Sequence, residues 1–464
     1  MFLPQAKRPL NVIVVGAGKK PTNLSRHWVS SVNLFDTTLA LGIGGLATAI
    51  SLAIRGHNVL VLEATPKLQE VGAGIQIAPN MRRVFKRLGI DQRIKDKAIV
   101  LERIKVFRWQ NGRLLNEVMV DHQYGECAVI HRADLHTILV ERALGLHNIV
   151  LRLNSTVMEI CFDSTKVILC GGESISGDVI IAADGIKSPV RSKMFLDGNQ
   201  PVPTGDAAFR IVIPRSIMIQ DPELRELIDT RQAVRWVGPD RHIVGYPIRN
   251  HELYNVVLAH PDKGWTSESW TASGSKDEML EVFRGWEPRV QKIVRAASNK
   301  EVLKSKLCLH LPLQTWVRGS CTLVGDACHP MLPYVAQGAA QALEDAAALG
   351  VVLSNVETVS EVPLALRIYE KSRKHRAEEV QRSGTQNRVS LHLHDGPDQV
   401  ARDEKFRASL AGGEDPDKWT DRKTQQILWG WDAEAEAQRC WSGMTVSLIE
   451  PALSCAPANS PQKP

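Results

Sequence analysis

The feature that most constrains this chain is a pair of glycine-containing segments near the N-terminus. The apolar run Val12–Val15 leads into Gly16-Ala-Gly18, and Ile43-Gly-Gly45 opens a helix of small residues. A second apolar run then ends on Glu63. Joined, the segments read as a strand, a G-x-G-x-x-G turn, a helix and a strand that ends on an acid. This is the order of a dinucleotide-binding βαβ unit.

Each residue of the motif has a physical role. Gly16 turns the chain out of the strand, Gly18 lets the backbone approach a pyrophosphate, and Gly45 packs the helix against the strand. The helix N-terminus offers unpaired N–H groups and partial positive charge to the phosphates. Glu63 can accept hydrogen bonds from a ribose. The sequence therefore predicts a dinucleotide site.

Residues 19–42 interrupt this motif. A phosphate-binding turn cannot hold such a segment and keep its N–H geometry. Gly18-Lys19 can be encoded with a splice donor and Leu41-Gly42 with a splice acceptor, and removal of the intervening codons preserves the reading frame. We therefore interpret residues 19–42 as a retained intron. A genuine surface insertion is the alternative.

Size and composition set further bounds. At 464 residues the chain is long enough for about two or three domains. The net charge of +6 is spread along the chain, so we expect no nucleic-acid partner. The eight cysteines show no zinc spacing, which fits a reducing compartment, and we expect a cytoplasmic protein. We expect neither a signal peptide nor a membrane span, because the nucleotide helix explains the uncharged stretch 37–54. The sequence leaves open a monomer or a dimer.

Local patterns predict the order of further elements. Asn111-Gly112 between two apolar runs predicts a β-hairpin over residues 104–120. A helix is expected to begin near Arg132, and a buried strand to end at Asp184. Residues 204–260 alternate as in a separate sheet domain, and a helix is predicted over 277–294.

The C-terminal part follows the same kind of reasoning. A strand is predicted to end on Gly325-Asp326 and to lead into a helix of small residues over 339–353. Helices are predicted over 364–382 and 422–441, and the basic run Lys371–Arg376 is interpreted as a solvated helix face.

Three strand ends with polar signatures now follow one another: the glycine motif with Glu63, the segment from Asp184 to Arg191, and Gly325-Asp326. With them, residues 10–18 and 43–400 resemble the class A flavoprotein monooxygenases, the p-hydroxybenzoate and salicylate hydroxylase family. Within that family, the chain is most similar to fungal salicylate-hydroxylase-like phenol monooxygenases of secondary metabolism.

The resemblance implies an α/β fold in which a Rossmann-like FAD-binding domain is interleaved with a sheet-rich substrate domain and followed by a helical region. We expect the FAD-binding domain over residues 10–200 and 311–395 and the substrate domain over 201–310. We expect C-terminal helices over 396–450 and a disordered tail over 451–464.

The resemblance also implies roles in binding FAD. Glu63 would hold the ribose, Arg132 the phosphate or ribitol region, and Asp326 the ribityl hydroxyls. Gly74 would lie beside the adenosine half, and Gly338-Ala339 would point N–H groups at the isoalloxazine N1–C2=O, where negative charge gathers on reduction. Asp184 and Arg191 would help to bind FAD and the transient NADPH or NADH.

The implied reaction is hydroxylation of a small aromatic, phenolic metabolite, such as a polyketide, by a flavin C4a-hydroperoxide formed with O2. Arg210 is a candidate for stabilising the phenolate, because arginine stays charged when buried. Tyr246 is a candidate for a hydrogen bond to the substrate oxygen or for a proton relay. His329 and Pro330–Pro333 are expected near the flavin ring. The structural alternatives are a strand arginine paired with an acid, and a tyrosine that packs the sheet.

Other functions remain as alternatives. A salicylate-like acid would undergo decarboxylative hydroxylation, and a translated segment 19–42 would leave the protein inactive. The tryptophan motif of flavin halogenases is absent, because Trp429-Gly-Trp431 continues with Asp-Ala. His392 and His394 have no partner cluster in the sequence, so we expect no metal site.

Overall fold

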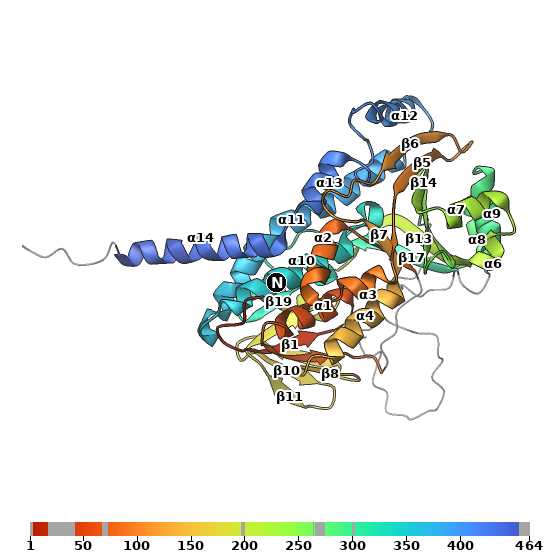
Figure 1. Ribbon diagram of the computed structural model, residues 1–464. Helices are drawn as coiled ribbons and strands as arrows, with labels where there is room; N and C mark the ends of the chain where they lie inside the picture. Colours follow the sequence, from red (N-terminus) through yellow and green to blue (C-terminus); the bar gives the residue numbers. More distant parts are fainter. Residues whose placement is uncertain are drawn as a thin grey trace, which may run out of the picture.

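The computed structural model describes residues 3–16, 42–66, 73–195, 200–262, 264, 274–298 and 302–453. Residues 17–41, which include Gly18 and most of the interrupting segment, lie outside the described residues. Residues 454–464 of the expected tail also lie outside them. The described residues form two large sheets and two small ones, joined and covered by helices (Figure 1).

The first large sheet has six strands in the order β18-β19-β12-β1-β2-β8. It is parallel except for the edge pair β18–β19. All four residues Val12–Val15 are buried, as expected for a parallel strand that is covered on both faces. The strands are β18 (Val317–Arg318), β19 (Cys321–Leu323), β12 (Val179–Ala182), β1 (Asn11–Val15), β2 (Asn58–Leu62) and β8 (Ile149–Arg152).

Helix α1 (Ile43–Ala53) connects β1 to β2, so the predicted βαβ unit is present in spite of the interruption. It packs tightly against the long helix α10 (Gly338–Ser354). A Cβ added to Gly44 would lie 3.1 Å from the Cβ of Ala342. Small residues at this crossing therefore bring both helix N-termini to the same region of the sheet.

The second large sheet has seven strands in the order β17-β13-β16-β15-β14-β5-β6. All neighbours are antiparallel except β14 and β5, which are parallel. The strands are β17 (Leu303–Leu309), β13 (Val202–Pro214), β16 (Leu253–Pro261), β15 (Arg241–Ile248), β14 (Gln232–Gly238), β5 (Arg103–Arg108) and β6 (Leu114–Met119). The predicted hairpin over 104–120 is thus confirmed as β5–β6. It belongs to this sheet, which therefore begins well before the predicted boundary at residue 201.

The two faces of the seven-stranded sheet have different neighbours. On the outer face, large apolar side chains such as Phe209 and Trp236 pack with helices α6 (Arg215–Met218), α7 (Pro222–Asp229), α8 (Lys276–Val282) and α9 (Pro288–Ala296), seen at the right of Figure 1. The inner face meets the loop between β19 and α10, as the cluster of Ala208, Ala259 and Leu332 shows.

Two predicted helices are each divided in the structure. The helix expected over 277–294 is α8 and α9, because Gly285 adopts φ +79° between them and Pro288 starts α9. The helix expected over 422–441 is α13 (Arg422–Trp429) and α14 (Ala433–Leu453), separated near Asp432, whose carboxylate accepts the N–H of Glu434.

The remaining elements complete the two layers. The helices are α2 (Pro79–Leu88), α3 (Asp91–Lys95), α4 (Arg132–Leu144), α5 (Pro189–Met194), α11 (Val362–Leu391) and α12 (Pro397–Ser409). One small sheet has the strand order β3 (Gly74–Ile77), β7 (Ala128–His131), β4 (Ile99–Val100), and the other has the order β11 (Ser174–Ser176), β10 (Lys166–Leu169), β9 (Val157–Cys161). Among the helices of the described ranges, none is long and apolar enough to cross a membrane.

Candidate active site

The carboxyl ends of β1, β2 and β12 meet at one edge of the parallel sheet. A cleft of about 290 Å³ lies there, lined by residues that include Gly16, Ala64 and Asp184. Glu63 directly precedes Ala64 at the end of β2 and is fully buried, and its Oε1 accepts the N–H of Thr65 at 2.9 Å. Open α/β sheets bind their ligands at this edge, so Gly16 and Glu63 lie where the motif predicts.

The N-terminus of α1 is suited to an anion. Its first turn contains Gly44 and buried Gly45, and it has no acidic residue. No side chain of the described residues caps it, since the N-cap is Gly42 in an extended conformation. The first N–H groups of the helix therefore remain for a phosphate, as they do in other dinucleotide sites.

Asp184 is a buried acid on the wall of this cleft. Its Oδ2 accepts the N–H of Val190 at 3.0 Å, and its Oδ1 has no hydrogen-bond partner among the described residues. Burial raises the pKa of Asp184 to about 6. Arg191 connects this loop to the next motif, because its guanidinium donates to the carbonyl oxygens of Ile186 and Ala327. The open oxygen of Asp184 fits a ligand that donates a hydrogen bond.

A second set of candidate residues consists of Gly74, Arg132 and Asp326. The Arg132 N–H donates to the carbonyl of Ala73, next to Gly74, at 2.8 Å. Asp326 follows β19 and lines an open cleft of about 630 Å³ together with residues that include Met331. The Asp326 side chain is exposed to this cleft, yet partial desolvation by the surrounding protein raises its pKa, while His329 and the Arg132 cation oppose that rise. The structure therefore brings Gly74, Arg132 and Asp326 into one region, as expected.

The N-terminus of α10 opens on the same region. Gly338 and Ala339 are partly exposed there, and a Cβ on Gly338 would lie 3.7 Å from Met331. The N-cap Gln337 makes no side-chain cap bond to the described residues, and the first turn holds no acid. An acceptor with partial negative charge would be stabilised at this position.

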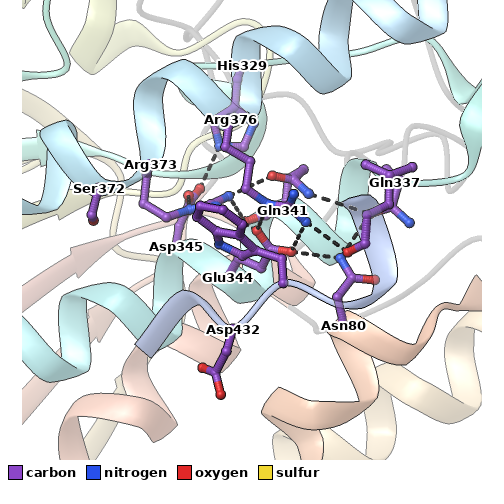
Figure 2. A network of polar contacts seen from close by, with 12 residues as sticks. Asn80, His329, Gln337, Gln341, Glu344, Asp345, Ser372, Arg373, Arg376 and Asp432 are labelled. Carbon is purple, nitrogen blue, oxygen red and sulfur yellow. Dashed lines mark hydrogen bonds and ion pairs between the residues drawn. The ribbon is translucent and has the colours of Figure 1, made fainter. Parts of the chain in front are cut away.

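A buried polar network holds these parts together (Figure 2). Asp345 on α10 accepts the Gly325 N–H at 2.9 Å and lies 2.6 Å from the His329 Nε2. Its second oxygen accepts Arg373 Nε on α11 at 2.9 Å. Although Cys328, His329 and Asp345 lie close enough to hold a metal ion, the Asp345 carboxylate is already fully used by these contacts. The network fixes the turn that carries Asp326.

The same network extends to α2 and the C-terminal helices. Glu344 accepts Arg376 Nη2 at 2.8 Å and the Asn80 amide at 2.7 Å, and it also pairs with Arg373 (Figure 2). Arg373 and Arg376 are buried, so the prediction of a solvated basic face over 371–376 is wrong for them. Their acidic partners on α10 explain the difference, because two Arg–carboxylate contacts replace the lost hydration.

The substrate candidates lie on the inner face of the seven-stranded sheet. Arg210 on β13 pairs with Val257, and Val257 pairs with Val244, which is two residues from Tyr246 on β15. Arg210 and Tyr246 therefore point to the same side of the sheet. Arg210 also contacts the hydroxyl of Ser305.

Electrostatics couple this pair to the FAD side of the site. Burial, together with the Arg132 cation, lowers the pKa of Arg210 to about 10, and Tyr246 opposes this shift. Burial raises the pKa of Tyr246 above its ordinary value, although Arg210 opposes that rise. A Cβ on Gly74 would lie 2.5 Å from the Tyr246 ring, so Gly74 contacts the substrate side of the site as well as the FAD side.

Sequence reasoning missed several polar residues of this region. Asn255, opposite Tyr246 on β16, accepts the Gly74 N–H at 2.6 Å. Glu344 and Asp345 had only the adjacent Glu-Asp pair in a small-residue helix as a signal. Asn255 stands in a run of apolar strand residues, and such an isolated polar residue is a detectable signal.

The sequence of this chain matches a known protein family. Residues 41–383 match the family model described as FAD binding domain. The chain belongs to this family. Its match begins at residue 41, at the C-terminal end of the interrupting segment.

Members of the FAD-binding family with similar sequences are monooxygenases. The FAD-dependent monooxygenase atnJ of Arthrinium sp is 41% identical over 417 residues, which cover 90% of this chain and 98% of the relative. The 3-hydroxybenzoate 6-hydroxylase of Klebsiella oxytoca is 34% identical over 340 residues, 72% of this chain and 82% of that enzyme. A solved salicylate hydroxylase substrate complex is similar with a TM-score of 0.74 and 25% identity, covering 94% of this chain and 98% of that one.

These findings confirm the class A aromatic monooxygenase family, the α/β fold and FAD as cofactor. The chain is an FAD-dependent monooxygenase. Its residues also fit FAD physically. The N-termini of α1 and α10 lack side-chain caps from the described residues, so their N–H groups can bind the phosphates and the flavin carbonyl. The buried Asp184 Oδ1 has no partner among the described residues, so it can accept a hydrogen bond from a hydroxyl group.

Proposed function

We propose that this monooxygenase hydroxylates a phenolic metabolite, with NADPH or NADH as reductant and O2 as oxidant. The observation that supports this proposal is the pair Arg210 and Tyr246 on the inner face of the sheet, beside Gly74 and coupled to Arg132. A buried cation next to a hydroxyl group is suited to hold a phenol as its phenolate.

Arg210 and Tyr246 have complementary roles in this proposal. With a pKa near 10, Arg210 is a cation at neutral pH and favours loss of the phenol proton. The raised pKa of Tyr246 keeps its hydroxyl neutral, so that it donates a hydrogen bond to the phenolate oxygen. Ionisation makes the aromatic ring electron-rich and directs the oxygen transfer to the ring carbons next to the phenolate carbon or opposite it.

Other residues hold the cofactor and exclude water. We propose that Gly16, Gly45, Glu63 and Asp184 bind the adenosine and pyrophosphate end of FAD, and that Arg132, Asp326, Gly338 and Ala339 hold the rest. Gly74, which the family resemblance places beside the adenosine half, lies against Tyr246, so we assign it to the flavin half instead. When bound and reduced, FAD supplies activated oxygen from O2. Apolar residues next to Tyr246, including Val244, Val335 and Trp419, limit the access of water.

The test is to reconstitute the protein with FAD and to follow NADPH and NADH oxidation with a panel of phenols. We expect phenol-dependent oxidation and a product that is one oxygen atom heavier by mass spectrometry. NAD(P)H consumption that releases only hydrogen peroxide with every phenol would contradict the proposal.

The similarity to salicylate hydroxylase favours one variant of this reaction. Arg210 could hold a carboxylate as well as a phenolate, because its guanidinium pairs with either. An ortho-hydroxy acid would then lose CO2 as the ring is hydroxylated. Measuring CO2 release from salicylate against product mass distinguishes this variant from simple hydroxylation.

We also propose that residues 19–42 are a retained intron, which the start of the family match at residue 41 supports. A chain that lacks residues 19–42 is expected to bind FAD, and the full chain to bind it far more weakly. Equal FAD content in both would show that the segment loops out harmlessly, and a major transcript that keeps these codons would contradict the intron. If neither chain binds FAD, the product is inactive.

A further inference from the structure

Asn255 is a buried polar residue that the reaction above does not yet use. It lies in the middle of β16, is 0% exposed, and pairs with Tyr246 on β15 and with Val212 on β13. Directly opposite residues of an antiparallel pair share a face, with Cβ atoms about 5 Å apart. Its side chain therefore lies beside Tyr246 and on the same side of the sheet as Arg210.

The orientation of the Asn255 amide is fixed by its one contact. The Gly74 N–H donates to Asn255 Oδ1 at 2.6 Å, and only the oxygen of the amide can accept this bond. The NH2 group consequently occupies the other position. It has no hydrogen-bond partner among the described residues, although it is buried. Leaving a buried donor unpaired is costly, which indicates that a ligand completes it.

Close packing places this amide against Gly74, on the face of the sheet that also carries Tyr246 and Arg210. A Cβ on Gly74 would lie 2.8 Å from Asn255 Cγ and 2.5 Å from the Tyr246 ring. The glycine thus allows the amide and the ring to lie against the loop that the FAD site also uses. With Arg210 and Tyr246, the inner face offers three hydrogen-bond donors within a small area.

We infer that the Asn255 NH2 group donates a hydrogen bond to a second oxygen on the substrate, next to the phenolate oxygen held by Arg210 and Tyr246. The preferred substrate class is then a phenol with a carbonyl group on the neighbouring ring carbon. An NH2 group can only donate, so the partner on the substrate is an acceptor. This inference rests on the proposed function.

The test compares two probes, 2,4-dihydroxybenzaldehyde and resorcinol, which differ by the carbonyl group. Their dissociation constants are measured from the change in the flavin absorbance of the FAD-loaded protein. We expect the wild-type protein to bind the aldehyde about 10- to 100-fold more tightly. Asn255→Asp keeps an acceptor for the Gly74 N–H but removes the donor, so the preference should fall to within about threefold.

Two controls separate this role from a structural one. Asn255→Leu removes both functions and should also lose the preference, while Val257→Ala on the same strand and face should keep it. Because the aldehyde is the more acidic phenol, the dissociation constants are measured across pH and compared for the same ionisation state of both probes, so that the new Asp charge acts equally on each. If Asn255→Asp keeps the full preference, Asn255 only holds Gly74, and the inference is wrong.

The two levels of failure are distinguishable. A wild-type protein that hydroxylates phenols but shows no preference for the aldehyde overturns the role of Asn255 alone. A wild-type protein that binds FAD but neither probe overturns the proposed function and this inference together.

Discussion

The two faces of the seven-stranded sheet are both buried, yet they are built from different chemistry. Phe209 and Arg210 are consecutive residues of β13 and show the contrast directly. Phe209 packs on the outer face among residues such as Trp236 and Leu258. Arg210 lies on the inner face near Tyr246 and Ser305. The outer face stabilises the sheet by burying apolar area, whereas the inner face carries polar side chains, whose burial costs free energy unless they are hydrogen-bonded.

The largest expected effect is on stability and comes from the outer face. Phe209→Ala should lower the free energy of unfolding by about 3–5 kcal/mol, because it leaves a cavity in a fully buried cluster. The kcat of the protein that remains folded and FAD-loaded should change little. Urea unfolding and active-site titration measure the two quantities. A loss of kcat without a loss of stability would break the comparison.

The neighbouring residue should show the reverse pattern. Arg210→Met should lower kcat/KM by about 100- to 1,000-fold, because the phenolate loses its cation, equivalent to about 3–4 kcal/mol. Stability should change little, since a half-buried cation that Arg132 repels is replaced by an apolar chain of similar length. Arg210→Lys serves as the control that keeps the charge. A large fall in the unfolding midpoint would instead support the structural alternative for this arginine.

Acid should weaken both faces, and the inner face more, because the inner face holds a pair of buried histidines, whereas the outer face holds His260, whose pKa burial also lowers. His242 lies 2.8 Å from His392 through their ring nitrogens, and burial lowers the pKa of both, that of His392 to about 4. The unfolded chain binds these protons near pH 6.5 and the folded chain does not, so stability is lost as the pH falls from 6.5 to 4. For His392 alone we expect a loss of about 3 kcal/mol over this range, and His242 adds a further loss.

Two variants check the origin of that slope. His242→Gln with His392→Gln should make the dependence of unfolding free energy on pH shallower between pH 6.5 and 4, while His57, His260 and His310, whose pKa values burial also lowers, keep part of it. Phe209→Ala should lower the whole curve and change its slope only by the share of His260, which stacks on Phe209. An unchanged slope in the double histidine variant would assign the acid sensitivity to other groups.

The smallest effect is expected at the hydroxyl of Tyr246. Tyr246→Phe keeps the ring against Gly74 and removes only the donor, so kcat/KM should fall by about 10- to 100-fold with stability unchanged. A plot of rate against pH should also lose any step that depends on this hydroxyl. Full activity in this variant would leave Tyr246 as a packing residue.

Sequence reasoning reached the fold through signals that are local. The glycine motif, the Asn111-Gly112 hairpin and the strand ends at Asp184 and Asp326 each depend on a few adjacent residues. The divided helices also carry local boundary signals, Gly285 with Pro288 and Asp432, and these outweigh the apolar periodicity that favours one continuous helix.

The errors and omissions involve contacts between distant segments. Burial of Arg373 depends on Glu344 and Asp345, which lie 29 and 28 residues earlier in the chain, so no local pattern reports this pairing. The parallel pair β5–β14 joins residues 103–108 to 232–237, so the hairpin alone could not reveal its sheet. The contact of Asn255 is with Gly74, which lies 181 residues earlier in the chain, so no local pattern reports it.

The route of the chain through the two sheets has a consequence for synthesis and for engineering. The chain enters the seven-stranded sheet with β5 and β6, returns to the parallel sheet with β8 and β12, and enters again with β13. A nascent chain therefore cannot finish either sheet early, because β12 lacks its neighbour β19 until residues 321–323 emerge, and β13 lacks its neighbour β17 until residues 303–309 emerge. A substrate sheet grafted from a relative must accordingly carry two pieces together, residues 103–119 and 202–309. A graft of the second piece alone would leave β14 without its neighbour β5.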